Sequence, residues 1–330
     1  MRSPRHAPYL LGRSPNLGGT MTVKSKHTDT AAIREESKAT PMAREFRDPT
    51  TRVKVSDRDE LDVWVMGEGT PIVFVHGAMT RDLLTPLIDE LANKGRYQLI
   101  HYGRRGHGGR GLPGEATDIP GQARDVVTVL DALRIDRAHV AGHSIGAMIT
   151  LELAMRVPHR LRSAILLEHG FFAQVRTEAS KQVLKEGDVL WPQLIEMYMS
   201  GETERAATTV WDVTSGIEGS RELIEPVLPA NTLALAARDL NTFLQVELAH
   251  LGSWMVDPVT VQEITTPIAW VSWADTAPLF RESGTILREW LPNTDAIEIV
   301  RAQSHYFPTL NPTETATALD EWLQTLGSSG

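Results

Sequence analysis

Runs typical of buried strands alternate with amphipathic helical patterns along most of this chain, and that alternation limits the fold more than any other feature. PIVFVH is continuously apolar, as in a strand that is covered on both faces. Further strands are predicted at Leu61–Met66, YQLIHY, AHVAG, SAILLEH, PIAWVSW and AIEIV. Between the strands, apolar residues recur at helical spacing, first at Leu83, Leu84, Leu87, Ile88 and Leu91. This order predicts an α/β fold in which helices flank a mostly parallel central sheet.

One stretch interrupts the alternation. No buried strand is predicted from about 172 to 261, where helical patterns occur alone, around Trp191–Met199, Ala207–Val213 and Ala234–Leu251. We therefore expect a helical cap over residues 172–261, inserted into a core made of residues 51–171 and 262–326. Residues 1–50 carry nine Lys or Arg against five acidic residues and show little periodicity, which predicts a poorly ordered arm. The closing Gly-Ser-Ser-Gly at 327–330 is typical of a linker scar.

Composition narrows the class of ligand. The 330 residues are 42% hydrophobic and 23% charged, which allows one large core. The net charge of -9 argues against binding of nucleic acid or an anionic membrane, and no apolar run approaches the roughly 18 residues of a membrane span. Cysteine is absent, which excludes disulfides and cysteine nucleophiles. We expect a cytoplasmic protein that binds a small, weakly polar molecule, with a homodimer as the commonest assembly for such proteins.

Ser144 is the candidate nucleophile. It lies in Gly142-His143-Ser144-Ile145-Gly146, a G-x-S-x-G pattern between the predicted strand AHVAG and a predicted helix from Ile145 to Met155. At such a turn the strained backbone lifts the serine hydroxyl above the sheet edge. The alternative is a serine that only caps the helix. The strand before it and the helix after it favour the nucleophile.

A serine nucleophile needs a base, and the base needs a carboxylate that holds it in one tautomer. His305 follows the predicted strand AIEIV, at the edge of the sheet where Ser144 is expected. Two acids are expected at the same edge, because Glu168 follows SAILL and Asp275 follows PIAWVSW. These positions alone leave the choice between the two acids open.

Backbone N–H groups are the expected donors to a substrate oxygen that becomes negatively charged. One is the N–H of Ile145, at the start of the helix after Ser144. The other is expected in the loop after PIVFVH, where Gly77 and Ala78 bring a small backbone close. Of these two we favour the N–H of Ala78 over that of Gly77.

Two other groups of polar side chains are assigned no chemistry. His101, His107 and Glu168 come from separate loops without the spacing of metal ligands, so no metal is expected. Three arginines in loop 104–110 suit either a substrate carboxylate or a solvated loop in which one arginine braces the fold. We favour the second interpretation.

The chain from about Val53 to Leu326 resembles an α/β-hydrolase of the lid-bearing ester and lactone hydrolase group. The shared motifs are His76-Gly77 after the second strand, Arg105-Gly106-His107-Gly108 after the third, the G-x-S-x-G pattern, and His305 followed by Pro308 and Pro312. The resemblance also bears on the acid. The family's usual aspartate slot falls on Thr276, whereas a minority of members place a glutamate where Glu168 stands, so Glu168 is favoured over Asp275.

Among the glutamate-type members, the chain is similar to lactonases that open the resorcylic macrolactone zearalenone. The similar features are Val129-Leu130-Asp131-Ala132-Leu133, the interval from Ser144 to Glu168, and His305-Tyr306-Phe307-Pro308. The resemblance implies a cofactor-independent hydrolase of a small apolar ester or lactone, with substrate contacts expected from Trp191, Met197, Trp211 and Tyr306. The alternatives are hydrolysis of a carbon–carbon bond in a diketone-like substrate, and a ligand receptor built on the same fold.

Overall fold

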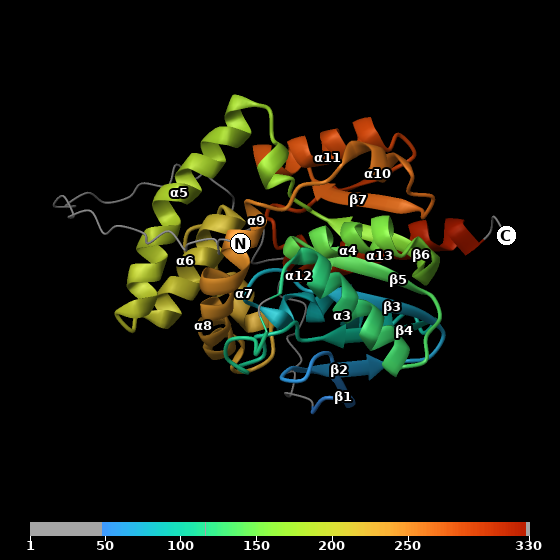
Figure 1. The fold of residues 1–330 in the computed structure, drawn as a ribbon, viewed down its shortest axis with the longest axis horizontal. Coiled ribbons are helices and arrows are strands. Elements are labelled where there is room, and N and C mark those ends of the chain that lie inside the picture. Colours follow the sequence, from blue (N-terminus) through green and yellow to red (C-terminus); the bar gives the residue numbers. More distant parts are fainter. Residues whose placement is uncertain (1–47, 116, 328–330) are drawn as a thin grey trace, which may run out of the picture.

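An eight-stranded sheet forms the centre of the molecule (Figure 1). The computed structural model describes residues 48–115 and 117–327. The strands are β1 (Thr51–Lys54), β2 (Glu60–Met66), β3 (Thr70–Val75), β4 (Tyr97–Tyr102), β5 (Ala138–His143), β6 (Leu161–Leu167), β7 (Ile268–Trp273) and β8 (Asp295–Ile299). Their order is β1-β2-β4-β3-β5-β6-β7-β8; β1 and β2 pair antiparallel, and all pairs from β4 to β8 are parallel. The predicted α/β fold with a mostly parallel sheet is confirmed.

Helices pack on both faces of this sheet. The main ones are α2 (Thr85–Ala92), preceded by the turn η1 (Arg81–Leu84), α3 (Ile119–Ala132), α4 (Ile145–Arg156), α11 (Pro278–Trp290) and α13 (Pro312–Gly327). In β3, Val73 and Val75 belong to the same apolar cluster as α3 and α4, whereas Ile72 and Phe74 join the cluster of α2 and α13. Because successive side chains of a strand point to opposite faces, β3 must be apolar throughout.

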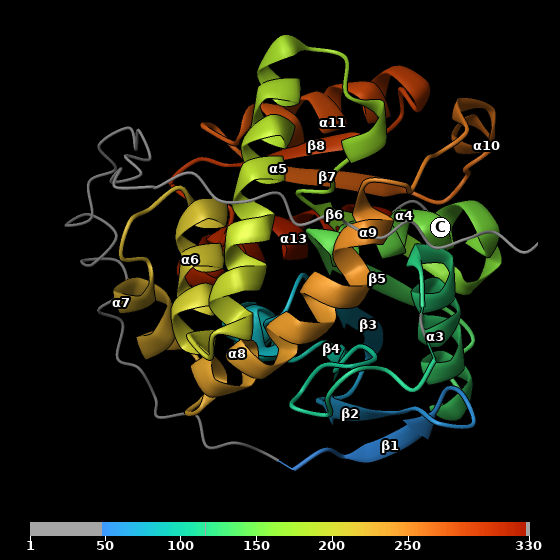
Figure 2. The same cartoon turned by 60° about the vertical axis from the view of Figure 1, so that its left-hand side comes forward.

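The chain between β6 and β7 is helical. Its elements are η3 (Phe172–Gln174), α5 (Glu178–Met199), α6 (Thr203–Ser215), α7 (Arg221–Ile224), η4 (Glu225–Val227), α8 (Thr232–Thr242), the π-helical turn η5 (Phe243–Glu247), α9 (Leu248–Leu251) and α10 (Pro258–Gln262). We call α5 to α9, residues 178–251, the helical insertion. In Figures 1 and 2, α5, α6 and α8 group beside one end of the sheet, while α10 lies near α11. Trp211 and Leu240 are fully buried in the cluster that includes α3 and α4, so the insertion packs on the core.

Three elements differ from the sequence expectation. β1 is absent from the predicted strands because it is a short edge strand in which only Val53 is buried. α3 begins at Ile119 rather than Arg124, because the Asp118 side chain accepts a hydrogen bond from the Gly121 N–H and caps the helix. α5 begins well before the predicted 191–199 pattern, in turns that are mostly exposed and carry few apolar residues.

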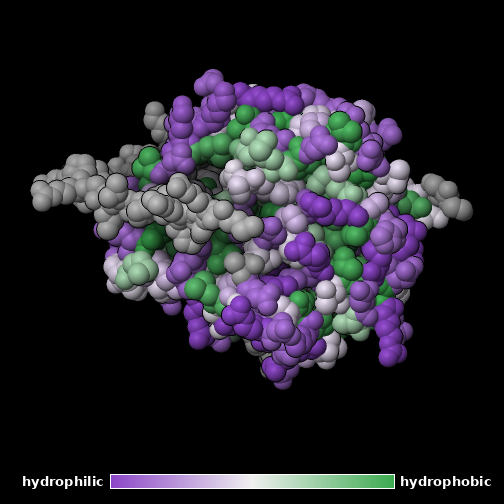
Figure 3. All heavy atoms as spheres, in the orientation of Figure 1, coloured by the Kyte–Doolittle hydropathy of each residue, from purple (hydrophilic) through white to green (hydrophobic). Residues whose placement is uncertain are grey.

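Hydrophilic side chains predominate on the face seen in Figure 3, where apolar residues form only small separate groups. Among the residues that the structure describes, no helix is both long and apolar enough to cross a membrane. The arm expected over residues 1–50 lies almost wholly outside the described residues. So do residues 328–330 of the expected linker scar, whose first residue, Gly327, ends α13.

Candidate active site

Ser144 occupies a strained turn between β5 and α4. Its φ of 56° and ψ of −117° lie in a region that residues other than glycine rarely adopt. The glycines of the pattern make this turn possible. A Cβ on Gly146 would lie 2.0 Å from the carbonyl oxygen of Val75, and one on Gly142 would lie 2.0 Å from that of Gly146. The G-x-S-x-G spacing is therefore required by close backbone contacts between the turn, α4 and β3.

Glu168 lies in a similar turn at the end of the neighbouring strand, with a φ of 52°. His143 of β5 pairs in register with Leu167 of β6. The Ser144 N–H donates to the Leu167 carbonyl at 2.9 Å, and the Glu168 N–H donates to the Val271 carbonyl at 3.0 Å. Ser144 and Glu168 thus each follow the last paired residue of two adjacent parallel strands.

His305 reaches Glu168 from the loop after β8. Its Nδ1 lies 2.6 Å from Glu168 Oε2, and the side chains are only 5% and 0% exposed. His143, the neighbour of Ser144, donates from Nε2 to the His305 carbonyl at 3.0 Å, and the two rings are 4.5 Å apart. Phe280 of α11 stacks nearly parallel on the His305 ring at 4.6 Å. These contacts fix the His305 imidazole beside the strained turn between β5 and α4 that carries Ser144.

The other candidate acid, Asp275, lies elsewhere. Its side chain is exposed in the turn after β7, and Nδ1 of His305 is already bonded to Glu168. Thr276, the slot of the usual aspartate, is instead buried beside Glu168. The structure therefore brings His305 together with Glu168.

Burial dominates the electrostatics of this site. It raises the pKa of the Glu168 carboxyl, while the nearby Thr276 hydroxyl and His143 act in the opposite direction. It lowers the pKa of the His305 imidazole, so the ring is neutral and can accept a proton.

The loop after β3 passes directly against Ser144. A Cβ on Gly77 would lie 3.1 Å from Ser144 Cβ. The Gly77 carbonyl accepts hydrogen bonds from His76 Nδ1 at 2.8 Å and from Arg104 Nη2 at 2.6 Å. Since the peptide bond is trans, the Ala78 N–H points away from this carbonyl.

Two backbone N–H groups near Ser144 have no hydrogen-bond partner shown among the described residues. The Ala78 N–H donates no hydrogen bond to any described residue. Ile145 begins α4, where the first N–H groups have no partner within the helix. Both predicted donors therefore remain available beside Ser144.

The helical insertion contacts this site through α6. Trp211 is fully buried and donates from Nε1 to Thr80 Oγ1 at 3.1 Å, in the loop after β3. The hydroxyls of Thr214 and Tyr306 lie 2.5 Å apart, which ties the same helix to the histidine loop. Of the other residues expected to bind substrate, Trp191 packs edge-on against Phe243 at 5.5 Å, and Met197 is half-buried.

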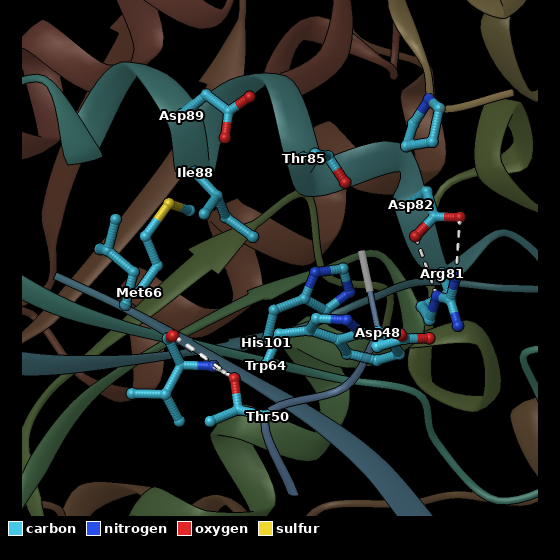
Figure 4. A pocket seen from close by; sticks show the side chains of 13 residues that line it. Asp48, Thr50, Trp64, Met66, Arg81, Asp82, Thr85, Ile88, Asp89 and His101 are labelled. Carbon is cyan, nitrogen blue, oxygen red and sulfur yellow. Dashed lines mark hydrogen bonds and ion pairs between the residues drawn. The ribbon is translucent and has the colours of Figure 1, made fainter. Parts of the chain in front are cut away.

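A separate pocket of about 160 Å³ opens beside β2 and β4 (Figure 4). Its lining includes Trp64, His101 and the ion pair between Arg81 and Asp82, and none of the predicted site residues. Within residues 48–115 and 117–327, no three His, Asp or Glu side chains are grouped to hold a metal ion. The three residues weighed as metal ligands are thus not assembled.

The three arginines of loop 104–110 are all paired, with Glu247, Asp125 and Asp62 respectively. Arg104 is the most buried of them, at 1%. No sequence pattern indicated Glu247 or Phe280 as neighbours of the site. Glu247 is 143 positions from Arg104, and no local sequence pattern predicts that the two residues pair.

A strained serine between a parallel strand and a helix, with a histidine and a carboxylate at the same sheet edge, defines the α/β-hydrolase class. The model of the alpha/beta hydrolase family matches residues 72–318, and the chain belongs to that family.

Individual relatives match smaller parts or only the fold. A protein provisionally named carbamate hydrolase RutD, from Azorhizobium caulinodans, is 39% identical over 104 residues, which is 31% of this chain and 38% of the relative. The chain thus spans well under half of that relative's length. Among solved structures, the N-acyl homoserine lactone degrading enzyme Est816 superposes with a TM-score of 0.62 at 22% identity, covering 82% of this chain and 99% of that one. A carboxylesterase structure from Nitrososphaera gargenis gives 0.67 at 15% identity, covering 85% and 100%.

Proposed function

We propose that this protein is a cofactor-independent serine hydrolase that opens a carboxylic ester or lactone. The observation that carries the proposal is the buried 2.6 Å contact between His305 and Glu168 at the sheet edge where Ser144 is held in its strained turn. The lactone-degrading and esterase names among the similar structures support the same substrate class.

In the proposed reaction, Ser144 Oγ attacks the carbonyl carbon while His305 Nε2 takes its proton. The N–H groups of Ile145 and Ala78 stabilise the resulting oxyanion. Glu168 stabilises the imidazolium that forms, which then protonates the leaving alcohol. Water, activated by the same histidine, releases the acid and regenerates the serine.

We propose a macrocyclic resorcylic lactone such as zearalenone as the substrate. The support is the Glu168 arrangement and two aromatic residues near the site. Trp211 of the insertion bonds to Thr80 in the loop after β3, and Tyr306 of the histidine loop contacts Thr214 of the insertion. Such aromatic side chains suit the apolar ring of the lactone. We further propose that the helical insertion acts as the cap over this substrate.

The test uses purified protein with zearalenone and, separately, with a short-chain p-nitrophenyl ester, each beside Ser144→Ala. Chromatographic loss of the macrolactone that depends on Ser144 is the expected result. Ester turnover without lactone loss would retain the serine mechanism and reject the substrate. Absence of Ser144-dependent turnover on both would reject ester hydrolysis, in favour of carbon–carbon hydrolysis or a receptor.

A further inference from the structure

Arg104 is a buried cation that the proposed reaction does not use. Its guanidinium donates from Nη2 to the Gly77 carbonyl at 2.6 Å. The same group pairs with both carboxylate oxygens of Glu247, and also donates to Gln122. The side chains of Arg104 and Glu247 are 1% and 3% exposed, so each charge depends on the other for compensation.

A second contact joins Arg104 to the same carbonyl through His76. The Arg104 backbone N–H donates to His76 Nε2 at 3.0 Å, so the proton of a neutral ring must sit on Nδ1. That nitrogen donates to the Gly77 carbonyl at 2.8 Å. Burial lowers the pKa of His76 well below its usual value, which keeps the ring in the neutral form that this arrangement needs. The Gly77 carbonyl is therefore held from two sides.

Glu247 comes from the helical insertion, where it ends the π-helical turn η5. Burial opposes its ionisation, but the Arg104 guanidinium holds its pKa below the ordinary value, so the carboxylate stays charged. Asp239 of α8 holds loop 104–110, the loop of Arg104, through separate contacts. It accepts from the N–H groups of Gly108 and Gly109 at 2.7 and 2.8 Å.

We propose that Arg104 and Glu247 are positioning residues through which the helical insertion orients the Gly77–Ala78 peptide. Glu247 fixes the guanidinium, the guanidinium fixes the Gly77 carbonyl, and the trans peptide then aims the Ala78 N–H at the substrate oxygen. The inference rests on the proposed function, because it assigns that N–H to the oxyanion. It makes the insertion part of the rate-determining machinery as well as a cover for the substrate.

The test compares Glu247→Gln, the double variant Arg104→Met/Glu247→Met and Asp239→Asn on a p-nitrophenyl ester. The double variant removes both buried charges together and so avoids an unpaired one, which keeps it foldable. Each protein is also titrated with an aryl trifluoromethyl ketone, whose serine adduct carries an oxyanion. Thermal unfolding records the stability of each variant separately.

We expect kcat and ketone affinity to fall together by about 10- to 100-fold in both Glu247 variants, with KM nearly unchanged, since a misaimed donor affects the transition state. Asp239→Asn should retain kcat and ketone affinity to within about threefold, even if it is less stable. A folded double variant with wild-type kcat and ketone affinity would overturn this inference and leave the proposed function intact. Lack of Ser144-dependent turnover in the wild-type protein would overturn the proposed function, and this inference with it.

Discussion

Replacing Glu168 with glutamine exchanges one carboxylate oxygen for an amide group in the pair with His305. The native carboxylate is fully buried and accepts a hydrogen bond from His305 Nδ1, which lies 2.6 Å from Glu168 Oε2. A glutamine amide can instead donate to Nδ1, which places the ring proton on Nε2, the atom that takes the Ser144 proton in the proposed reaction. The imidazolium also loses its buried counter-charge. A comparable change in a serine triad costs about 10⁴ in turnover, or about 5.4 kcal/mol in the barrier.

Asp275→Asn is the matched control, since it makes the same chemical change on an exposed side chain one strand away. Steady-state kcat on the ester should fall by roughly four orders of magnitude for Glu168→Gln and by less than about twofold for the control. Circular dichroism melts establish that both variants are folded. If Asp275→Asn loses activity while Glu168→Gln keeps it, the assignment of the acid is wrong.

Three further predictions concern the acid slot, the elbow and the buried histidines. Adding Thr276→Asp to Glu168→Gln should recover about 10-fold or more of the lost kcat, because position 276 lies beside the lost carboxylate; no recovery would show that this slot cannot reach His305. Gly146→Ala should unfold the protein or lower its Tm far more than Gly95→Ala, because a Cβ at position 146 would lie 2.0 Å from backbone. A Cβ at position 95 meets nothing within 4 Å, so Gly95→Ala should cost only about 1 kcal/mol. Equal Tm losses would contradict this. Buried histidines that are neutral when folded gain protons on unfolding, so urea midpoints should fall as the pH drops from about 6.5 to 4, against a smaller opposite effect from three buried acids with raised pKa values, Asp125, Glu168 and Asp239; a flat profile would refute this. Burial lowers the pKa of His76, His101, His107, His139, His143, His169 and His305.

Much of the core fold and the location of the candidate site follow from local sequence. Strands buried on both faces are mostly apolar, so β3 and the first four residues of β7 are visible as continuous runs. In a parallel sheet, the residues that follow successive strands meet at one edge, which is why the sequence alone places Ser144, Glu168 and His305 together. These positions do not decide between the two acids, because Glu168 and Asp275 follow neighbouring strands equally well. The choice of Glu168 from the sequence depended on the family resemblance.

What escaped prediction depends on contacts between distant segments. β1 has one buried residue and too little apolar surface to stand out. The first turns of α5 are exposed, so no apolar stripe marks them. The pairing of Arg104 with Glu247 depends on how the helical insertion packs on the core, and neither residue lies in a pattern that indicates the other.

The two positive φ angles at Ser144 and Glu168 have a consequence for evolution in the laboratory. Each such angle costs about 1–3 kcal/mol, and the buried carboxylate adds a desolvation cost. Glycine at these positions would relieve the backbone strain. A selection for heat resistance that made no demand on turnover would therefore replace these two residues early. If the proposed mechanism holds, the most heat-stable variants would then lack hydrolase activity.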